Sequence, residues 1–127
     1  MKKIVIVLFV MLFCTQVFAK PKLGTKLPLP GKSLANVKLQ ADTLLAAYTT
    51  ASTKNKGCED MNIVNTHVLV PPKDLKMEKG KYVSGYWVES WDINCCGNMT
   101  YVPIRFTLDK TGASYSINQN LIKVAKH

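Results

Sequence analysis

The strongest constraint on the fold is an alternating stretch, residues 81–117, which holds both tryptophans and two of the four cysteines. Every second residue between positions 83 and 93 falls on one face, and that face carries Trp87, Glu89 and Trp91. Successive side chains of a β-strand point to opposite sides of its sheet. The pattern therefore predicts one long strand with a heavily aromatic face.

Two turns divide this stretch into strands. Residues 95–98, Cys-Cys-Gly-Asn, interrupt the alternation with turn-forming residues, and residues 100–108 resume it. Residues 109–112, Asp-Lys-Thr-Gly, supply a second turn before a third strand. We therefore expect a three-stranded antiparallel meander. Because Pro103 has no amide hydrogen, either its strand lies at an edge or its nitrogen points away from the neighbouring strand.

An amphipathic helix is expected before the sheet. Ser33 is a suitable N-cap, and the helix is predicted to run from there to Thr50. Apolar residues recur at helical spacing along one side, namely Leu34, Val37, Ala41, Leu44, Leu45 and Tyr48. This stripe is expected to pack on the sheet.

One more strand is expected between the helix and the meander. Residues 62–70 alternate, and Pro71 and Pro72 are expected to end that strand. Residues 73–80 are predicted to form a solvated connection. The sequence thus predicts an α+β domain over residues 33–127, with one N-terminal amphipathic helix packed on a four-stranded, mainly antiparallel sheet that is held by one disulfide.

The N-terminus has the three parts of a signal peptide. A basic start at Lys2 and Lys3 is followed by an apolar run over residues 4–14, and residues of the kind that signal peptidase accepts lead to Ala19. The apolar run is shorter than a membrane-spanning helix needs. We therefore expect residues 1–19 to be removed after Ala19, leaving a periplasmic or secreted protein without a transmembrane segment.

The net charge of the chain limits the classes of binding partner that we expect. Residues 20–32 are rich in proline and lysine and are predicted to form an extended basic arm. Without residues 1–19 the chain has 15 basic and 8 acidic residues, a net charge of +7, which favours a protein or an anionic envelope component as partner. The lysines are scattered and Arg105 is the only arginine, so nucleic acid is not expected.

Three cysteines remain after the signal peptide, and their chemistry in an oxidising compartment is a disulfide. Adjacent cysteines rarely bond to each other, so Cys58 is expected to pair with Cys95 or with Cys96. The remaining thiol could join two chains. A metal site built from the three cysteines and His67 is disfavoured because no ligand spacing supports it, and we expect no metal and no cofactor.

No arrangement of residues points to catalysis. His67 is the only internal histidine, and no serine lies in a nucleophile-elbow context. Glu89 and Asp92 fall on opposite faces of one strand, so they cannot flank a glycosidic bond. We therefore expect the protein not to be an enzyme.

Aromatic and charged residues of the meander form the candidate binding surface. Its members are Trp87, Glu89, Trp91, Tyr86, Tyr101 and Arg105. The tryptophans also suit packing against the helix. Glu89 falls on the face that is expected to be buried, where a carboxylate needs a partner such as Arg105 or a lysine.

Part of the chain resembles small exported proteobacterial proteins of unknown function. The resemblance rests on Cys58, on Gly-Tyr-Trp-Val-Glu-Ser-Trp at residues 85–91, and on a Cys-Gly turn at residues 96–97. It covers about residues 58–117 and implies a bond between Cys58 and Cys96. It brings no activity with it.

These observations lead to one functional expectation and two alternatives. We expect a non-enzymatic exported accessory or binding protein of the bacterial envelope. A helix followed by a curled meander also resembles the broad architecture of cystatin-like and nuclear-transport-factor-like domains. The alternatives at the level of fold are therefore a protease inhibitor and a small-ligand pocket protein or enzyme.

Overall fold

The computed structural model describes residues 26–125 of the chain. The predicted signal peptide, its cleavage site and the first residues of the predicted arm lie outside the described residues. The elements are α2 (Val37–Lys54), β1 (Met61–Glu78), β2 (Lys81–Cys95), β3 (Asn98–Asp109), β4 (Gly112–Ile117), a 3₁₀ turn η1 (Gln119–Leu121) and β5 (Lys123–Ala125). Among residues 26–125, no helix combines the length and apolarity needed to cross a membrane.

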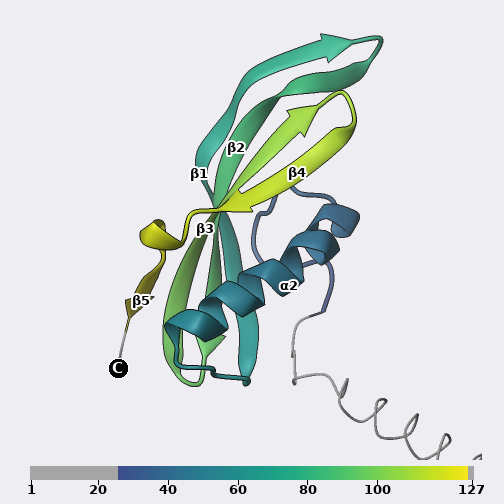
Figure 1. Ribbon diagram of the computed structural model, residues 1–127. Coiled ribbons are helices and arrows are strands. Elements are labelled where there is room, and N and C mark those ends of the chain that lie inside the picture. The colour runs from purple at the N-terminus through teal and green to yellow at the C-terminus, as the bar shows by residue number, and fades with distance from the viewer. Residues whose placement is uncertain (1–25, 126–127) are drawn as a thin grey trace, which may run out of the picture.

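The sheet has the order β1-β2-β3-β4, all neighbours antiparallel, and β5 pairs with β3. Helix α2 lies across one face of this sheet, and the β1–β2 and β3–β4 hairpins extend beyond it (Figure 1). The predicted α+β fold is thus confirmed, with β5 as an additional strand. Pro103 pairs with Ser90 of β2 and falls between the part of β3 that pairs with β5 and the part that pairs with β4, so its missing amide hydrogen interrupts neither of those two ladders.

Strand β1 does not end at the two prolines as predicted. Val70 pairs with Val88 and Lys73 pairs with Tyr86, so three steps along β1 match two along β2. Pro71 and Pro72 fall in this bulge, on a strand at the edge of the sheet, where missing amide hydrogens break no regular ladder. Residues 73–80 are exposed, as predicted, but the prediction of a connection there is wrong, because most of these residues continue the strand.

Helix α2 begins later and faces differently from the prediction. Its N-cap is Asn36, whose side chain accepts from the Leu39 amide at 2.8 Å. The buried residues are Leu39, Gln40, Thr43, Ala47, Tyr48 and Ala51. Val37 and Leu45, assigned to the packed stripe, are 50% and 70% exposed. The apolar pattern missed the true face because buried polar residues are satisfied locally, as when the Thr43 hydroxyl donates to the Leu39 carbonyl at 2.7 Å.

The core forms between α2 and the face of β2 and β3 that the alternation predicted. Trp91, Ile104 and Phe106 have no exposed surface, and the Trp87 and Phe106 rings stack with centroids 5.2 Å apart. In β1, Ile63 and Thr66 are both buried although the predicted alternation put them on opposite faces. A register shift between Ile63 and Asn65 causes this change of phase.

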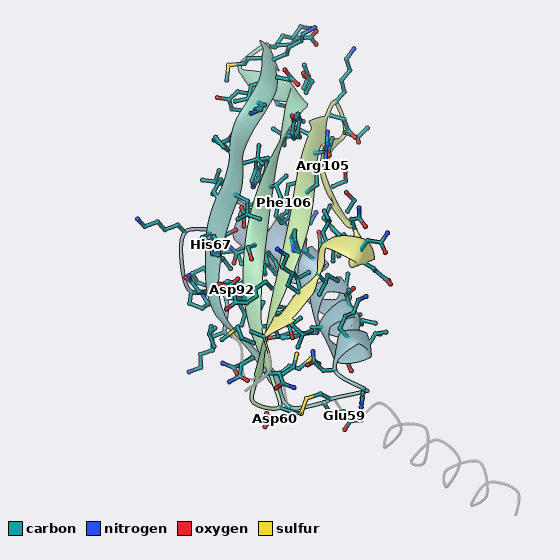
Figure 2. All side chains as sticks on the ribbon, turned by 90° about the vertical axis from the view of Figure 1, so that its left-hand side faces the viewer. Glu59, Asp60, His67, Asp92, Arg105 and Phe106 are labelled. Atoms are coloured by element: carbon teal, nitrogen blue, oxygen red, sulfur yellow. A yellow bond between two sulfur atoms is a disulfide. The ribbon has the colours of Figure 1, made fainter. Side chains whose placement is uncertain are left out.

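A disulfide joins Cys58 to Cys96 at the end of the sheet where Glu59 and Asp60 lie (Figure 2). Cys96 occupies a two-residue turn, in which it has a φ of 50° and the following glycine has a φ of 88°. This turn directs Cys96 away from the strand pattern, and Cys95 stays in that pattern and is fully buried. The disulfide part of the fold prediction is therefore confirmed, with Cys96 as the partner.

The described part of the predicted arm packs on the domain. The Leu29 amide donates to Gln40 Oε1 at 2.8 Å, and the Thr66 hydroxyl donates to the Pro30 carbonyl at 2.8 Å. The Lys32 amide donates to the Thr66 carbonyl at 2.9 Å. These bonds attach the segment before α2 to Gln40 of the helix and to Thr66 of the edge strand β1.

Candidate binding site: an apolar groove beside a buried carboxylate

The carboxylate of Glu89 lies in the core and has no exposed surface. Its Oε1 accepts hydrogen bonds from the Ser33 hydroxyl at 2.7 Å and from Trp91 Nε1 at 3.0 Å. Its Oε2 accepts from the Leu34 amide at 2.8 Å and from Trp87 Nε1 at 2.7 Å. Within the described chain all four partners act as donors, an arrangement that suits an ionised carboxylate.

This network fastens the segment before α2 to the middle of the sheet. Sequence reasoning expected a cation such as Arg105 beside Glu89, but neutral donors take that place. Arg105 pairs across the ladder with Val88, so it points to the opposite face, where its guanidinium lies 4.0 Å from the centre of the Tyr86 ring. Glu89 therefore positions Ser33 and Leu34 and is closed to solvent.

The residues of the candidate binding surface do not lie together. Trp87, Glu89 and Trp91 point into the core, where a surface partner cannot reach Glu89 or Trp91. Tyr86, Tyr101 and Arg105 lie on the other face of the sheet, because strand alternation separates them from the first three. Of the six, Trp87 lines the groove described next.

An open groove of about 390 Å³ lies on the helix side of the sheet. Its lining consists of Leu34, Ala35, Asn36 and Leu39 at the start of α2, Pro72, Leu75 and Tyr82 of the β1–β2 hairpin, and Trp87, Leu108 and Ala113 of β2, β3 and β4. The side chains on its two sides are well exposed, with Leu34 at 52%, Leu75 at 42% and Tyr82 at 47%. The groove can therefore hold an apolar group without rearrangement of the core.

One wall of the groove depends on a glycine. Gly85 has a φ of +131°, and a Cβ atom there would lie 2.5 Å from Leu75 Cδ2 and 3.1 Å from the Lys73 carbonyl oxygen. Sequence reasoning missed this wall because it predicted a connection at residues 73–80. The signal was the alternation of Leu75 and Met77 with charged residues.

The opposite face of the sheet carries a polar cluster that is not a catalytic triad. The Ser90 hydroxyl donates to Asp92 Oδ1 at 2.8 Å, and Asp92 Oδ2 lies 3.5 Å from His67 Nδ1. His67 and Asp92 lie near each other in the middle of the sheet (Figure 2). Because the carboxylate separates the hydroxyl from the imidazole, His67 cannot take a proton from Ser90.

The structure does not bring together the three cysteines and His67 that a metal site would need. The Cys58 and Cys96 sulfurs are bonded to each other, so they are not free thiolates. Among the described residues, no three histidine, cysteine, aspartate or glutamate side chains gather in a way that could hold a metal ion.

Cys95 keeps a free thiol, and we expect it to be unreactive in the folded protein. Burial raises the pKa of the Cys95 thiol, and a hydrogen bond with Thr100 lowers it by less. Iodoacetamide at about pH 8, near the pKa of an unperturbed thiol, is expected to label the Cys95 peptide only after denaturation. Mass spectrometry of the labelled peptide measures this, and rapid labelling of the native protein would contradict the buried position.

Comparisons with protein-family models, with curated proteins and with solved structures found no match. Function is therefore inferred from the geometry of residues 26–125. The two candidate binding features are the apolar groove and the exposed hairpin that forms one of its walls.

Proposed function

We propose that the protein is a non-enzymatic exported binding protein that attaches to an anionic surface of the bacterial envelope. The attaching element is the hairpin tip, residues 73–82, at the far end of β1 and β2. The observation that carries the proposal is the exposure of apolar side chains among lysines there. Leu75, Met77 and Tyr82 are 42%, 57% and 47% exposed.

The charge of the hairpin tip suits an anionic surface. Its basic residues are Lys73, Lys76, Lys79 and Lys81, and its acidic residues are Asp74 and Glu78, all of them exposed. A lysine close to an anionic bilayer contributes roughly 1 kcal/mol to attachment. Interfacial leucine, methionine and tyrosine side chains add apolar burial at the headgroup level.

The shape of the molecule allows this contact. The β1–β2 hairpin reaches beyond α2 at the end of the sheet opposite the disulfide (Figures 1 and 2). Its two strands pair from Met61 with Cys95 to Glu78 with Lys81, with bulges on the way, so the tip is paired to its end. The resemblance to small exported proteobacterial proteins and the signal-peptide pattern support the location.

The test is attachment to lipid vesicles by a charge-reversed variant. The double variant Lys73→Glu/Lys76→Glu is expected to bind vesicles of phosphatidylcholine and phosphatidylglycerol at least about thirtyfold more weakly than the native sequence, since two favourable charges of roughly 1 kcal/mol each are lost and become repulsive. Co-sedimentation with the vesicles measures the affinity.

A matched control separates local from overall charge. Lys54→Glu/Lys123→Glu makes the same change in net charge, but it alters the end of α2 and the start of β5, which lie away from the hairpin tip (Figure 1). This control is expected to change the affinity by about threefold at most, because charges beyond a Debye length are screened. Equal losses in the two double variants would refute the hairpin tip as the attaching element.

A further inference from the structure

We propose that the apolar groove binds the acyl chain of an anionic amphiphile, one molecule per protein. This activity goes beyond surface attachment, because it concerns a single molecule taken up from solution in the absence of a bilayer. The ligand class is a saturated chain that ends in one carboxylate or phosphate.

The lining selects an apolar chain. Among residues 26–125, no charged residue lines the groove, and its polar side-chain groups are the Asn36 amide, the Tyr82 hydroxyl and the Trp87 indole N–H, which donates to Glu89. The Asn36 oxygen already accepts from the Leu39 amide at 2.8 Å, so it serves the helix. A sugar or a nucleotide would lose its hydrogen bonds to water here without replacement. A volume of about 390 Å³ falls within the range of ligand pockets.

The segments that supply the lining carry more lysines than acidic residues, and this local excess of positive charge favours an anionic ligand. Four lysines adjoin lining residues in the sequence, namely Lys38, Lys73, Lys76 and Lys81. Two acidic residues, Asp74 and Asp109, also adjoin lining residues, but Asp109 Oδ1 already accepts from the Thr111 amide and hydroxyl. The first turn of α2 contains no acidic side chain that would repel an anionic head group.

The floor of the groove is held in place before a ligand arrives. The Trp87 indole donates to the buried Glu89 carboxylate at 2.7 Å and stacks on Phe106. The chain has two tryptophans, and the other, Trp91, has no exposed surface. Trp87 is therefore both a rigid contact for the acyl chain and a spectroscopic reporter of its arrival.

The experiment is quenching of tryptophan fluorescence by 12-bromododecanoate, below its micelle concentration and without vesicles. We expect saturable quenching with one site per chain, because a bromine atom in the groove contacts Trp87. Ala113→Phe is expected to weaken binding about tenfold by filling the groove from the exposed strand β4. Ser114→Phe is the matched control, since its neighbouring exposed position does not line the groove. It is expected to bind as the native sequence does.

Several results would overturn all or part of the proposed binding in the groove. Quenching that fails to saturate, or that Ala113→Phe leaves unchanged while circular dichroism shows a folded protein, overturns the proposal. If Ala113→Phe does not fold, displacement of the brominated probe by unbrominated dodecanoate tests the same site, and the absence of displacement overturns it. Dodecanol competes more weakly than dodecanoate if the lysines act on the head group, and equal competition removes the anionic part of the proposal.

The two proposals can fail separately. Ala113 lies outside the hairpin tip, so Ala113→Phe is expected to retain attachment to anionic vesicles. If Ala113→Phe loses probe binding but still attaches to vesicles, the groove binds its ligand independently of surface attachment. If the native protein binds the probe saturably but does not bind anionic vesicles, the groove site is supported and surface attachment is refuted.

Discussion

Replacement of Glu89 by glutamine is expected to lower the free energy of unfolding by about 2 to 4 kcal/mol, although the two side chains have the same shape. Each carboxylate oxygen accepts from one tryptophan indole, Oε1 from Trp91 and Oε2 from Trp87. Whichever oxygen becomes the amide nitrogen, one indole N–H then faces another donor and loses its acceptor. Urea denaturation measures the loss.

The matched control is Glu78→Gln, which makes the same chemical change at an exposed position of β1. Exposed charges contribute little to stability, so this variant is expected to change the free energy by about 0.5 kcal/mol or less. A Glu89→Gln variant as stable as the control would contradict the structural role of the buried carboxylate. It would also mean that Ser33 and Leu34 are held before α2 by other contacts.

Removal of the disulfide is expected to have a comparable effect. The Cys58–Cys96 bond closes a loop with a sequence separation of 38. In the chain-entropy description such a loop stabilises the folded state by about 4 kcal/mol at 25 °C. Domains of this size have about 5 to 15 kcal/mol in total. The double variant Cys58→Ser/Cys96→Ser is therefore expected to unfold at much lower urea concentration.

Reduction provides the control for this prediction. A thiol reductant is expected to destabilise the native protein by a similar amount and to leave the double variant unchanged. Cys95→Ala keeps the bond and loses only a buried sulfur, so its loss is expected to be about 1 kcal/mol. A native protein whose unfolding is insensitive to reductant would show that the bond does not contribute as described.

The meander could be predicted because its signal is local. Period-two alternation over β2 and β3 is long and regular, and the register of these strands contains no shift. The choice between Cys95 and Cys96 was left open by the residues alone, because a turn can rotate either side chain. The positive φ of Cys96 decides it.

The groove could not be predicted because it depends on features that break local patterns. Bulges carry β1 through Pro71 and Pro72, and they create the wall that Leu75 forms against Gly85. Helix α2 begins only at Val37, so Leu34 lies in the segment before it and is exposed at the groove. Two of the four donors to Glu89, the Ser33 hydroxyl and the Leu34 amide, are 56 and 55 residues distant in the chain, a distance at which sequence pattern carries no information.

Attachment to an anionic surface is the central claim, and the most direct measurement uses the native protein with its disulfide formed. Its co-sedimentation with vesicles of pure phosphatidylcholine is compared with that for vesicles that also contain phosphatidylglycerol. We predict binding to the anionic vesicles alone, weakening as salt is added because screening shortens the reach of the lysines. Equal binding to both kinds of vesicle, or no binding to either, would contradict the proposed function.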